Sequence, residues 1–220
     1  MVTSSTHNMR VGVEITRLSK KVLGSRDINK KNLATQMVDA MLAELKQKTS
    51  NNVSVADLAR SIGVSVGAPY RHFDDRDELL DHVAAVGFDQ LRARMTKHMS
   101  KEEPTSVQRI VEGGLGYIFF SVENKNLFHV MWDGSRRREP HFPSTGAGER
   151  AYATFIANLV VIMHATGHGE QDPMAFGSPL WTMVHGYASL LVANERMLDP
   201  SENALREQIS VITHRYFNAR

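Results

Sequence analysis

Apolar residues recur at spacings of three and four along most of this 220-residue chain, which is the repeat of one face of an α-helix. Ala34, Val38, Met41 and Leu45 form the first clear stripe, which ends at the polar break 49–52. Strand-like alternation of β-branched residues is scarce, and the sequence contains no internal repeat. We therefore predict an all-α protein of about nine helices.

Two short helices are predicted directly after that break. Ser54 can cap a helix that ends where Gly63 supplies a left-handed residue. Ser65 can cap a third helix over residues 66–73, so the two helices are joined by a turn of only a few residues. This spacing is the first sign of a specific supersecondary motif.

A long helix is predicted to follow and to contain the domain boundary. Asp75 and Glu78 form a capping-box pattern that opens this helix, which continues towards residue 99. The later segments are separated by proline, glycine and polar residues, with an exposed loop at 133–147. The further helices that we predict cover 104–122, 124–132, 148–166, 173–198 and 200–218.

Composition limits the chemistry that is available. The sequence has no cysteine, which excludes disulfides, thiolate zinc sites and cysteine nucleophiles. The longest apolar stretch, residues 155–163, is far too short to span a bilayer, so we expect a cytoplasmic protein without membrane contact. The net charge is only +2, yet residues 1–31 carry seven Lys or Arg against two acids. This basic extension is either solvated or an arm that follows nucleic-acid phosphates.

Two short helices around a tight turn with small residues are the sequence form of a DNA-reading helix-turn-helix. Ala59 and Gly63 occupy the positions that need small residues. On the third helix, Arg71 and His72 can donate to base edges or phosphates. Any small helical bundle can carry such surface groups, so the spacing alone leaves DNA binding open. The candidate DNA-binding residues are Ser54, Ser65, Val66, Gly67, Tyr70, Arg71, His72 and Arg76.

Residues 54–80, which read SVADLARSIGVSVGAPYRHFDDRDELL, resemble the DNA-binding segment of the TetR (tetracycline-repressor-like) family. The resemblance implies a homodimer that places two recognition helices in successive major grooves of a palindromic operator. Pro69 departs from the family pattern, in which an apolar residue such as Leu is more usual, and it removes a backbone donor. The expected organisation is a basic extension (1–29), a helix-turn-helix domain (30–80) and a helical effector-binding and dimerisation domain (81–220).

The C-terminal half has 13 acids against 11 bases over residues 101–220, so it offers no general basic face. Its bulky apolar residues either fill a plain core or line a ligand cavity. Trp181 and His185 are four residues apart, which places both on one helix face. The candidate effector-binding residues are Phe120, Phe128, Met131, Trp132, Phe155, Met163, Trp181 and His185.

The Trp-x-x-x-His-Gly pattern at 181–186, with Gly116-Tyr117 and the stretch 123–128, resembles a TetR subgroup with a Trp-His-Gly C-terminal domain. The resemblance implies a repressor that a small apolar or amphipathic effector, bound between residues 104 and 186, releases from its operator. It also implies that the last two helices pair with those of a second copy. The residues suited to that dimer interface are Leu190, Leu191, Leu205, Ile209, Ile212 and Tyr216.

Two alternatives stay open at this point. One is a DNA-binding protein without a small effector, in which the C-terminal half serves only dimerisation or docks a protein partner. The other is a histidine-based metalloenzyme, because His164 and His168 are four apart and are followed by Glu170. Gly167 breaks that helix and no further catalytic motif accompanies it, so we expect no enzyme, no cofactor and no metal.

Overall fold

The computed structural model describes residues 25–136, 146–193 and 201–219, so the predicted basic extension up to residue 24 and the loop 137–145 lie outside the described residues. The described ranges contain α-helices and short 3-10 turns but no β-strand, which confirms the all-α prediction. No helix in them is long and apolar enough to cross a membrane. The eight described α-helices are α2 (Ser25–Leu45), α3 (Val55–Ser61), α4 (Arg76–Met99), α5 (Gln108–Glu123), α6 (Lys125–Trp132), α7 (Ala147–Ala165), α8 (Pro173–Val192) and α9 (Glu202–Asn218).

The N-terminal domain, called the head below, is a small helical unit built on α2. Of the predicted stripe of α2, Val38, Met41 and Leu45 are buried and Ala34 is half-buried; Met37, which the prediction did not include, is fully enclosed as well. Leu58 of α3 and Phe73 are buried in the same core. The helix begins at Ser25, several residues before the predicted start at 30.

The segment 65–73 is not the continuous α-helix that the sequence predicts. Only Pro69–Arg71 form a 3-10 turn, η2, and no side chain caps it. A separate turn precedes η2, closed by the Ala68 N–H donating to the Ser65 carbonyl at 2.9 Å. Pro69 lacks the N–H that an α-helix would bond to that carbonyl, and Gly67 loses more backbone entropy on ordering than other residues do. These two residues explain why the helix gives way to two tight turns.

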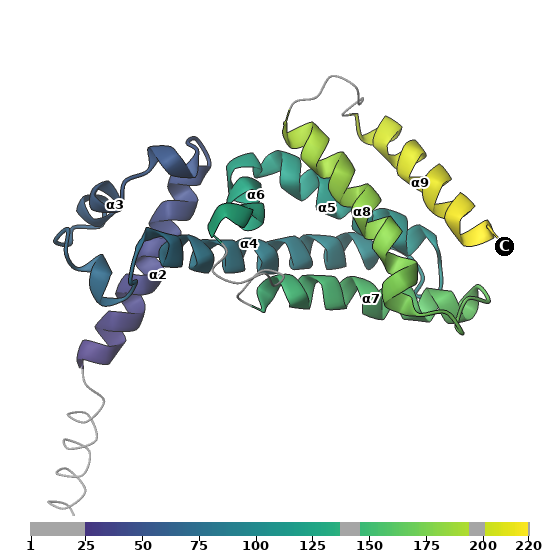
Figure 1. The fold of residues 1–220 in the computed structure, drawn as a ribbon, viewed down its shortest axis with the longest axis horizontal. Helices are drawn as coiled ribbons and strands as arrows, with labels where there is room; N and C mark the ends of the chain where they lie inside the picture. Colours follow the sequence, from purple (N-terminus) through teal and green to yellow (C-terminus); the bar gives the residue numbers. More distant parts are fainter. Residues whose placement is uncertain (1–24, 137–145, 194–200, 220) are drawn as a thin grey trace, which may run out of the picture.

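Helix α4 runs from the head into the C-terminal domain and packs on α2, α5, α6 and α7 (Figure 1). Its start is capped as predicted, because the Asp75 side chain accepts from the Glu78 N–H at 2.9 Å. Its end is held by Arg109 of α5, whose guanidinium donates to the carbonyls of Met99 and Glu102 at 2.8 and 2.7 Å. A single helix, capped at both ends, therefore connects the two domains.

Helix α5 is the centre of the C-terminal domain, which is named the sensor below after the role that the sequence predicts for it. Every residue from Ile110 to Ile118 is buried, and α5 packs on α4, α8 and α9. A Cβ at Gly114 would lie 2.9 Å from a methyl of Val184, so the glycines of α5 permit close helix approach. The helix begins at Gln108 rather than near Pro104, which lies in the preceding turn.

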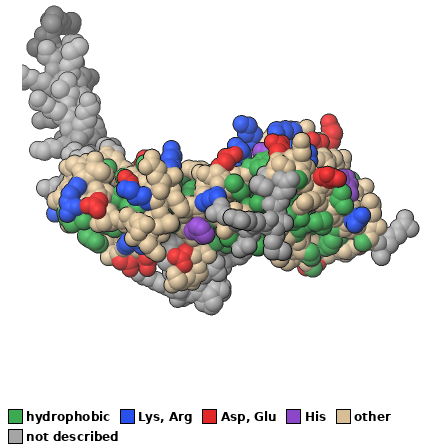
Figure 2. Space-filling model, turned by 90° about the horizontal axis from the view of Figure 1, so that it is seen from above, with side chains coloured by type: hydrophobic (Ala, Val, Ile, Leu, Met, Phe, Trp, Pro, Cys, Tyr) green, Lys and Arg blue, Asp and Glu red, His purple; other side chains and the backbone are tan. Residues whose placement is uncertain are grey.

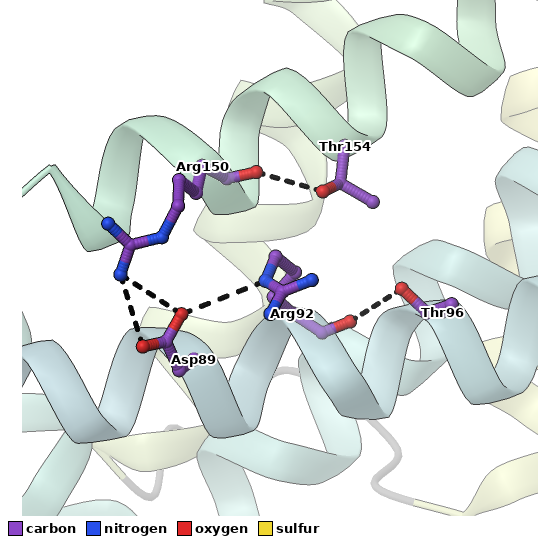
Figure 3. Close-up of polar contacts among 5 residues, drawn as sticks. All are labelled: Asp89, Arg92, Thr96, Arg150 and Thr154. Atoms are coloured by element: carbon purple, nitrogen blue, oxygen red, sulfur yellow. Dashed lines mark hydrogen bonds and ion pairs between the residues drawn. The ribbon is translucent and has the colours of Figure 1, made fainter.

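Polar contacts fix α7 against α4 on the surface of the sensor. Arg150 of α7 bonds both carboxylate oxygens of Asp89 at 3.1 and 3.2 Å, and Arg92 pairs with the same carboxylate at 3.7 Å (Figure 3). The hydroxyls of Thr96 and Thr154 donate to carbonyls within their own helices. Exposed ion pairs of this kind contribute little stability, so their effect is mainly on the orientation of α7.

A buried carboxylate joins three helices elsewhere in the sensor. Glu112 of α5 is only 2% exposed and forms an ion pair with Arg206 of α9. His98 of α4 lies on its other side, with Nδ1 at 3.6 Å from a Glu112 oxygen. Burial, together with Lys101 and Arg94, lowers the pKa of His98, and Glu112 opposes this shift. The neutral imidazole is therefore favoured beside the Arg206–Glu112 pair.

Candidate functional site

The first short helix of the head is positioned as predicted. The Ser54 side chain accepts from the Ala56 N–H at 3.2 Å and caps α3. Gly63 has a φ of 75°, and the Val64 N–H closes the end of the helix on the Ala59 carbonyl at 2.9 Å. The helix–turn part of the motif is therefore present.

The turns after α3 present their side chains outward. Tyr70 is 56% exposed, Val66 is 43% exposed and Arg71 is exposed, whereas Pro69 and Phe73 are buried. The chain thus anchors the segment through two apolar residues and leaves its donors and its aromatic ring free of the core. This surface, residues 65–72, is called the reading segment below.

Three of the predicted DNA-binding residues have a different setting from the rest. His72 is half-buried and packs beside Phe73, with ring centroids 6.5 Å apart. Ser65 is exposed but caps no helix, which corrects that prediction. Arg76 is half-buried, and its guanidinium donates to the Ser50 carbonyl. Arg76 therefore already ties α4 to the turn before α3.

The sensor contains an aromatic cluster centred on Tyr117 of α5. Its ring makes edge contacts with Phe128, Trp181 and His185, at centroid distances of 6.2, 5.3 and 6.1 Å. The Tyr117 hydroxyl lies 2.8 Å from Nδ1 of His185. Sequence reasoning did not select Tyr117 as a site residue, because its partner is 68 positions away and only helix packing brings the two together.

The protonation of this pair follows from its burial. Burial raises the pKa of Tyr117 far above its ordinary value, and the neighbouring Trp132 indole acts in the opposite direction. Burial also lowers the pKa of His185, so the imidazole is neutral near pH 7. The Tyr117 hydroxyl therefore stays protonated and can donate a hydrogen bond to Nδ1 of His185. In that tautomer the imidazole N–H is on the second nitrogen, Nε2.

The predicted effector-binding residues divide into three groups. Phe128, Trp132 and His185 line an open cleft of about 650 Å³. Phe155 and Trp181 line an internal cavity of only about 20 Å³, which is essentially filled. The others line neither space and are buried in the core, where Met131 packs against Gly87 of α4; these are Phe120, Met131 and Met163.

The predicted dimer-interface residues also divide. Leu190 of α8 and Ile212 of α9 are 42% and 41% exposed. Tyr216 is half-buried and donates to the Phe176 carbonyl at 3.0 Å. The remaining three are buried within the single chain and present little surface to a partner; these are Leu191, Leu205 and Ile209.

The two histidines considered for a metal site, His164 and His168, have different neighbours. His168 lies 3.2 Å from the Thr166 hydroxyl through Nδ1, and the His164 ring packs against Gly169. Among the residues that the structure describes, no group of three or more His, Asp or Glu side chains is arranged to hold a metal ion.

Comparison with known proteins covers both domains. Residues 38–83 match the family described as "Bacterial regulatory proteins, tetR family", and residues 110–211 match "Tetracyclin repressor-like, C-terminal domain". The chain is 26% identical over 145 residues to an uncharacterized HTH-type transcriptional regulator of Haemophilus influenzae, covering 64% of this chain and 69% of that protein. It is 25% identical over 87 residues to an HTH-type transcriptional regulator of Staphylococcus aureus, covering 39% of this chain and 46% of that protein.

Solved structures share the fold. A protein of unknown function from Rhodococcus sp. RHA1 superposes with a TM-score of 0.70 at 23% identity, over 84% of this chain and 94% of that chain. The TetR family regulator PfmR from Thermus thermophilus superposes with a TM-score of 0.53 at 18% identity, over 84% and 98%. The two family matches and the named relatives are those of transcriptional regulators, not of enzymes. The chain belongs to the TetR family of DNA-binding transcriptional regulators.

Proposed function

We propose that this regulator is a homodimeric repressor that binds a palindromic operator through its reading segment and is released by a small apolar or amphipathic effector. The observation that carries the proposal is the reading segment itself. Its exposed groups, Tyr70 and Arg71 above all, have no part in the core, while Pro69 and Phe73 hold the segment on the head. Such donors are suited to phosphates and to base edges in a groove. A regulator of this kind acts in the cytoplasm, where the DNA is.

The dimer is supported by the apolar surface of the last two helices. Of seven exposed large apolar residues among those described, four lie on α8 and α9: Met174, Leu190, Val211 and Ile212. Apolar side chains reach the surface over the C-terminal half, and Lys, Arg, Asp and Glu are interspersed on the same face (Figure 2). A two-fold pairing around Leu190 and Ile212 would remove this apolar surface from water.

Release by an effector requires that the effector binds the two arrangements of the heads with different affinity. The open cleft beside His185 provides a space for such a molecule, and α4 runs from the head into the sensor. The filled internal cavity beside Trp181 favours a second candidate function, a DNA-binding dimer without a small effector. The two functions differ in whether any compound weakens operator binding.

Footprinting and sedimentation test the proposal together. We expect hydroxyl-radical protection of two symmetric half-sites about 34–36 Å apart on DNA flanking the gene, and two chains per site. Leu190→Glu places a charge in the proposed interface and should give a monomer that leaves the site unprotected, whereas Glu207→Gln, on an exposed part of α9, serves as a control. A single protected half-site, or a Leu190→Glu variant that stays dimeric, would contradict the dimer. If no compound from an aromatic library weakens the complex, the candidate without an effector is preferred.

A further inference from the structure

An open cleft lies where the head meets the sensor, and residues of both domains line it. The head contributes Thr49, Ser50 and Asn51, which belong to the turn between α2 and α3. The sensor contributes residues of α6, of the turn that follows it and of the end of α8. Its volume of about 650 Å³ lies within the range of small-molecule sites, roughly 300–1,000 Å³.

The sensor wall of the cleft is aromatic. Trp132 and His185 have ring centroids 4.5 Å apart, and Phe128 and His185 have centroids 5.7 Å apart. The two pairs are tilted, with interplanar angles of 57° and 35°, so the rings offer faces and edges for edge-to-face or offset contact with a further ring. None of the described residues that line the cleft is a Lys or Arg, and Asp133 is among them, so this described lining does not favour a strongly anionic ligand.

His185 can offer one hydrogen-bond donor in that wall. In the tautomer in which the Tyr117 hydroxyl donates to Nδ1 of His185, 2.8 Å away, the N–H is on Nε2. Its neighbour within the protein is the Ser189 hydroxyl, at a long 3.4 Å. An acceptor on a ligand that stacks beside the ring can take this hydrogen bond with better geometry.

We propose that the cleft between head and sensor binds a flat aromatic compound with a neutral hydrogen-bond acceptor, whose ring packs on Trp132 and Phe128 and whose acceptor takes the N–H of His185. Such a ligand touches the turn 49–51 of the head directly. The identification of this ligand with the effector rests on the proposed function; the binding itself does not.

The contacts beside the cleft connect its occupant to the head. Asn126 of α6 lines the cleft, and its amide donates to the Leu45 carbonyl at the end of α2 at 2.9 Å. On the head side, the Ser50 carbonyl accepts from Arg76 of α4. A compound that spans from His185 to residues 49–51 contacts the turn beside these two hydrogen bonds. It therefore changes the orientation of the head relative to the sensor by direct contact, rather than through a movement of α4.

Two probes that differ only in the acceptor test the site: 1-indanone, which has a ketone oxygen, and indane, which has none. The chain has only two tryptophans, so the two indole N–H signals in a ¹H–¹⁵N NMR spectrum report on the cleft (Trp132) and on the inner cluster (Trp181). A Trp181→Phe variant assigns the two signals. We expect 1-indanone to shift the Trp132 signal saturably, with the Trp181 signal less affected. Indane should bind roughly three- to tenfold more weakly, because it lacks one hydrogen bond.

Variants separate the cleft from other sites. A Cβ at Gly134, on the cleft wall, meets no other atom within 4 Å, so a side chain can begin there; Gly134→Phe adds a ring at the cleft wall and should abolish the titration. Ser135→Phe, at the next and exposed position, should leave it unchanged. His185→Phe keeps a ring and removes the donor, so the preference for 1-indanone over indane should disappear. A circular dichroism melt checks that each variant is folded.

Several outcomes would overturn the proposal. These are no shift of the Trp132 signal with 1-indanone, equal affinity for the two probes, or a titration that Gly134→Phe leaves unchanged. Its failure is distinguishable from failure of the proposed function. If a compound releases wild-type protein from an operator and Gly134→Phe responds equally, the cleft is wrong and the repressor stands. If 1-indanone binds in the cleft but no operator exists, the repressor is wrong and the cleft stands.

Discussion

The head and the sensor differ in whether their candidate functional side chains are exposed or buried. In the head, the functional surface consists of a seven-residue helix and a three-residue turn, with Tyr70 and Arg71 exposed. In the sensor, α5 is buried over consecutive turns, and aromatic side chains of α5, α6, α7 and α8 contact one another. In the proposed function, DNA recognition therefore depends on side chains that add little to stability, whereas effector binding depends on side chains that the fold itself requires. Substitutions in the two regions should therefore separate binding from stability.

The largest effect on stability is expected from a truncation in the sensor core. Ile118 is fully buried in α5, so Ile118→Ala removes apolar contacts and leaves a cavity. We expect the free energy of unfolding to fall by about 2–5 kcal/mol, measured by urea denaturation. Val161→Ala, at an exposed position on α7, is the matched control and should change it by less than about 0.5 kcal/mol. Equal losses in both variants would contradict the described burial.

In the reading segment, we expect a substitution to weaken operator binding and to leave stability almost unchanged. Arg71→Ala removes an exposed donor and should weaken operator binding by about 1–3 kcal/mol, read from a fluorescence anisotropy titration. Its free energy of unfolding should stay within about 0.5 kcal/mol of wild type. Arg215→Ala removes the same charge from an exposed site on α9 and should bind DNA as wild type does. If both variants lose affinity equally, only overall charge matters and the reading segment is wrong.

At the N-cap of α3 in the head, we expect stability and operator binding to change together. Ser54→Ala removes the hydroxyl that accepts from the Ala56 N–H, which should cost about 0.5–2 kcal/mol of unfolding free energy. Operator binding should weaken with it, since α3 supports the reading segment. Ser54→Asp retains a cap acceptor and should restore stability but not DNA affinity, because it adds a negative charge. Recovery of both would place Ser54 outside the DNA interface.

Much of the head was predictable because local rules determine it. Ser54, Gly63 and Asp75 each act through backbone groups a few residues away, and all three cap or end helices as predicted. Pro69 alone predicts only the loss of one backbone donor, but together with Gly67 it replaces the expected helix by two turns.

The sensor site was less predictable for the opposite reason. The sequence correctly marked Trp181 and His185 as lying on one helix, but the structure places them at different cavities. The pairing of Tyr117 with His185 depends on how α5 and α8 cross, and the head residues 49–51 reach the cleft only through tertiary packing. No spacing in the sequence encodes either contact.

The smallest expected effect is a dependence of stability on pH that originates in the sensor. Burial lowers the pKa of His185 and of His98 below the ordinary value of 6.5 in the folded protein. The unfolded chain then binds more protons as the pH falls through that value, so the free energy of unfolding should decrease below about pH 6.5. Urea midpoints between about pH 7.5 and about pH 5.5 measure this dependence. His185→Phe should flatten the curve, and a stability that rises on acidification would contradict the described burial.

We propose that the head recognises a specific DNA sequence through its exposed reading segment. The most direct test is an anisotropy titration of the purified protein against DNA flanking its own gene, at several salt concentrations and with excess nonspecific DNA. We predict tight binding to one fragment that survives the competitor and that Arg71→Ala loses. Equal and steeply salt-dependent binding to every fragment would contradict the claim, because it would reflect phosphate contacts alone.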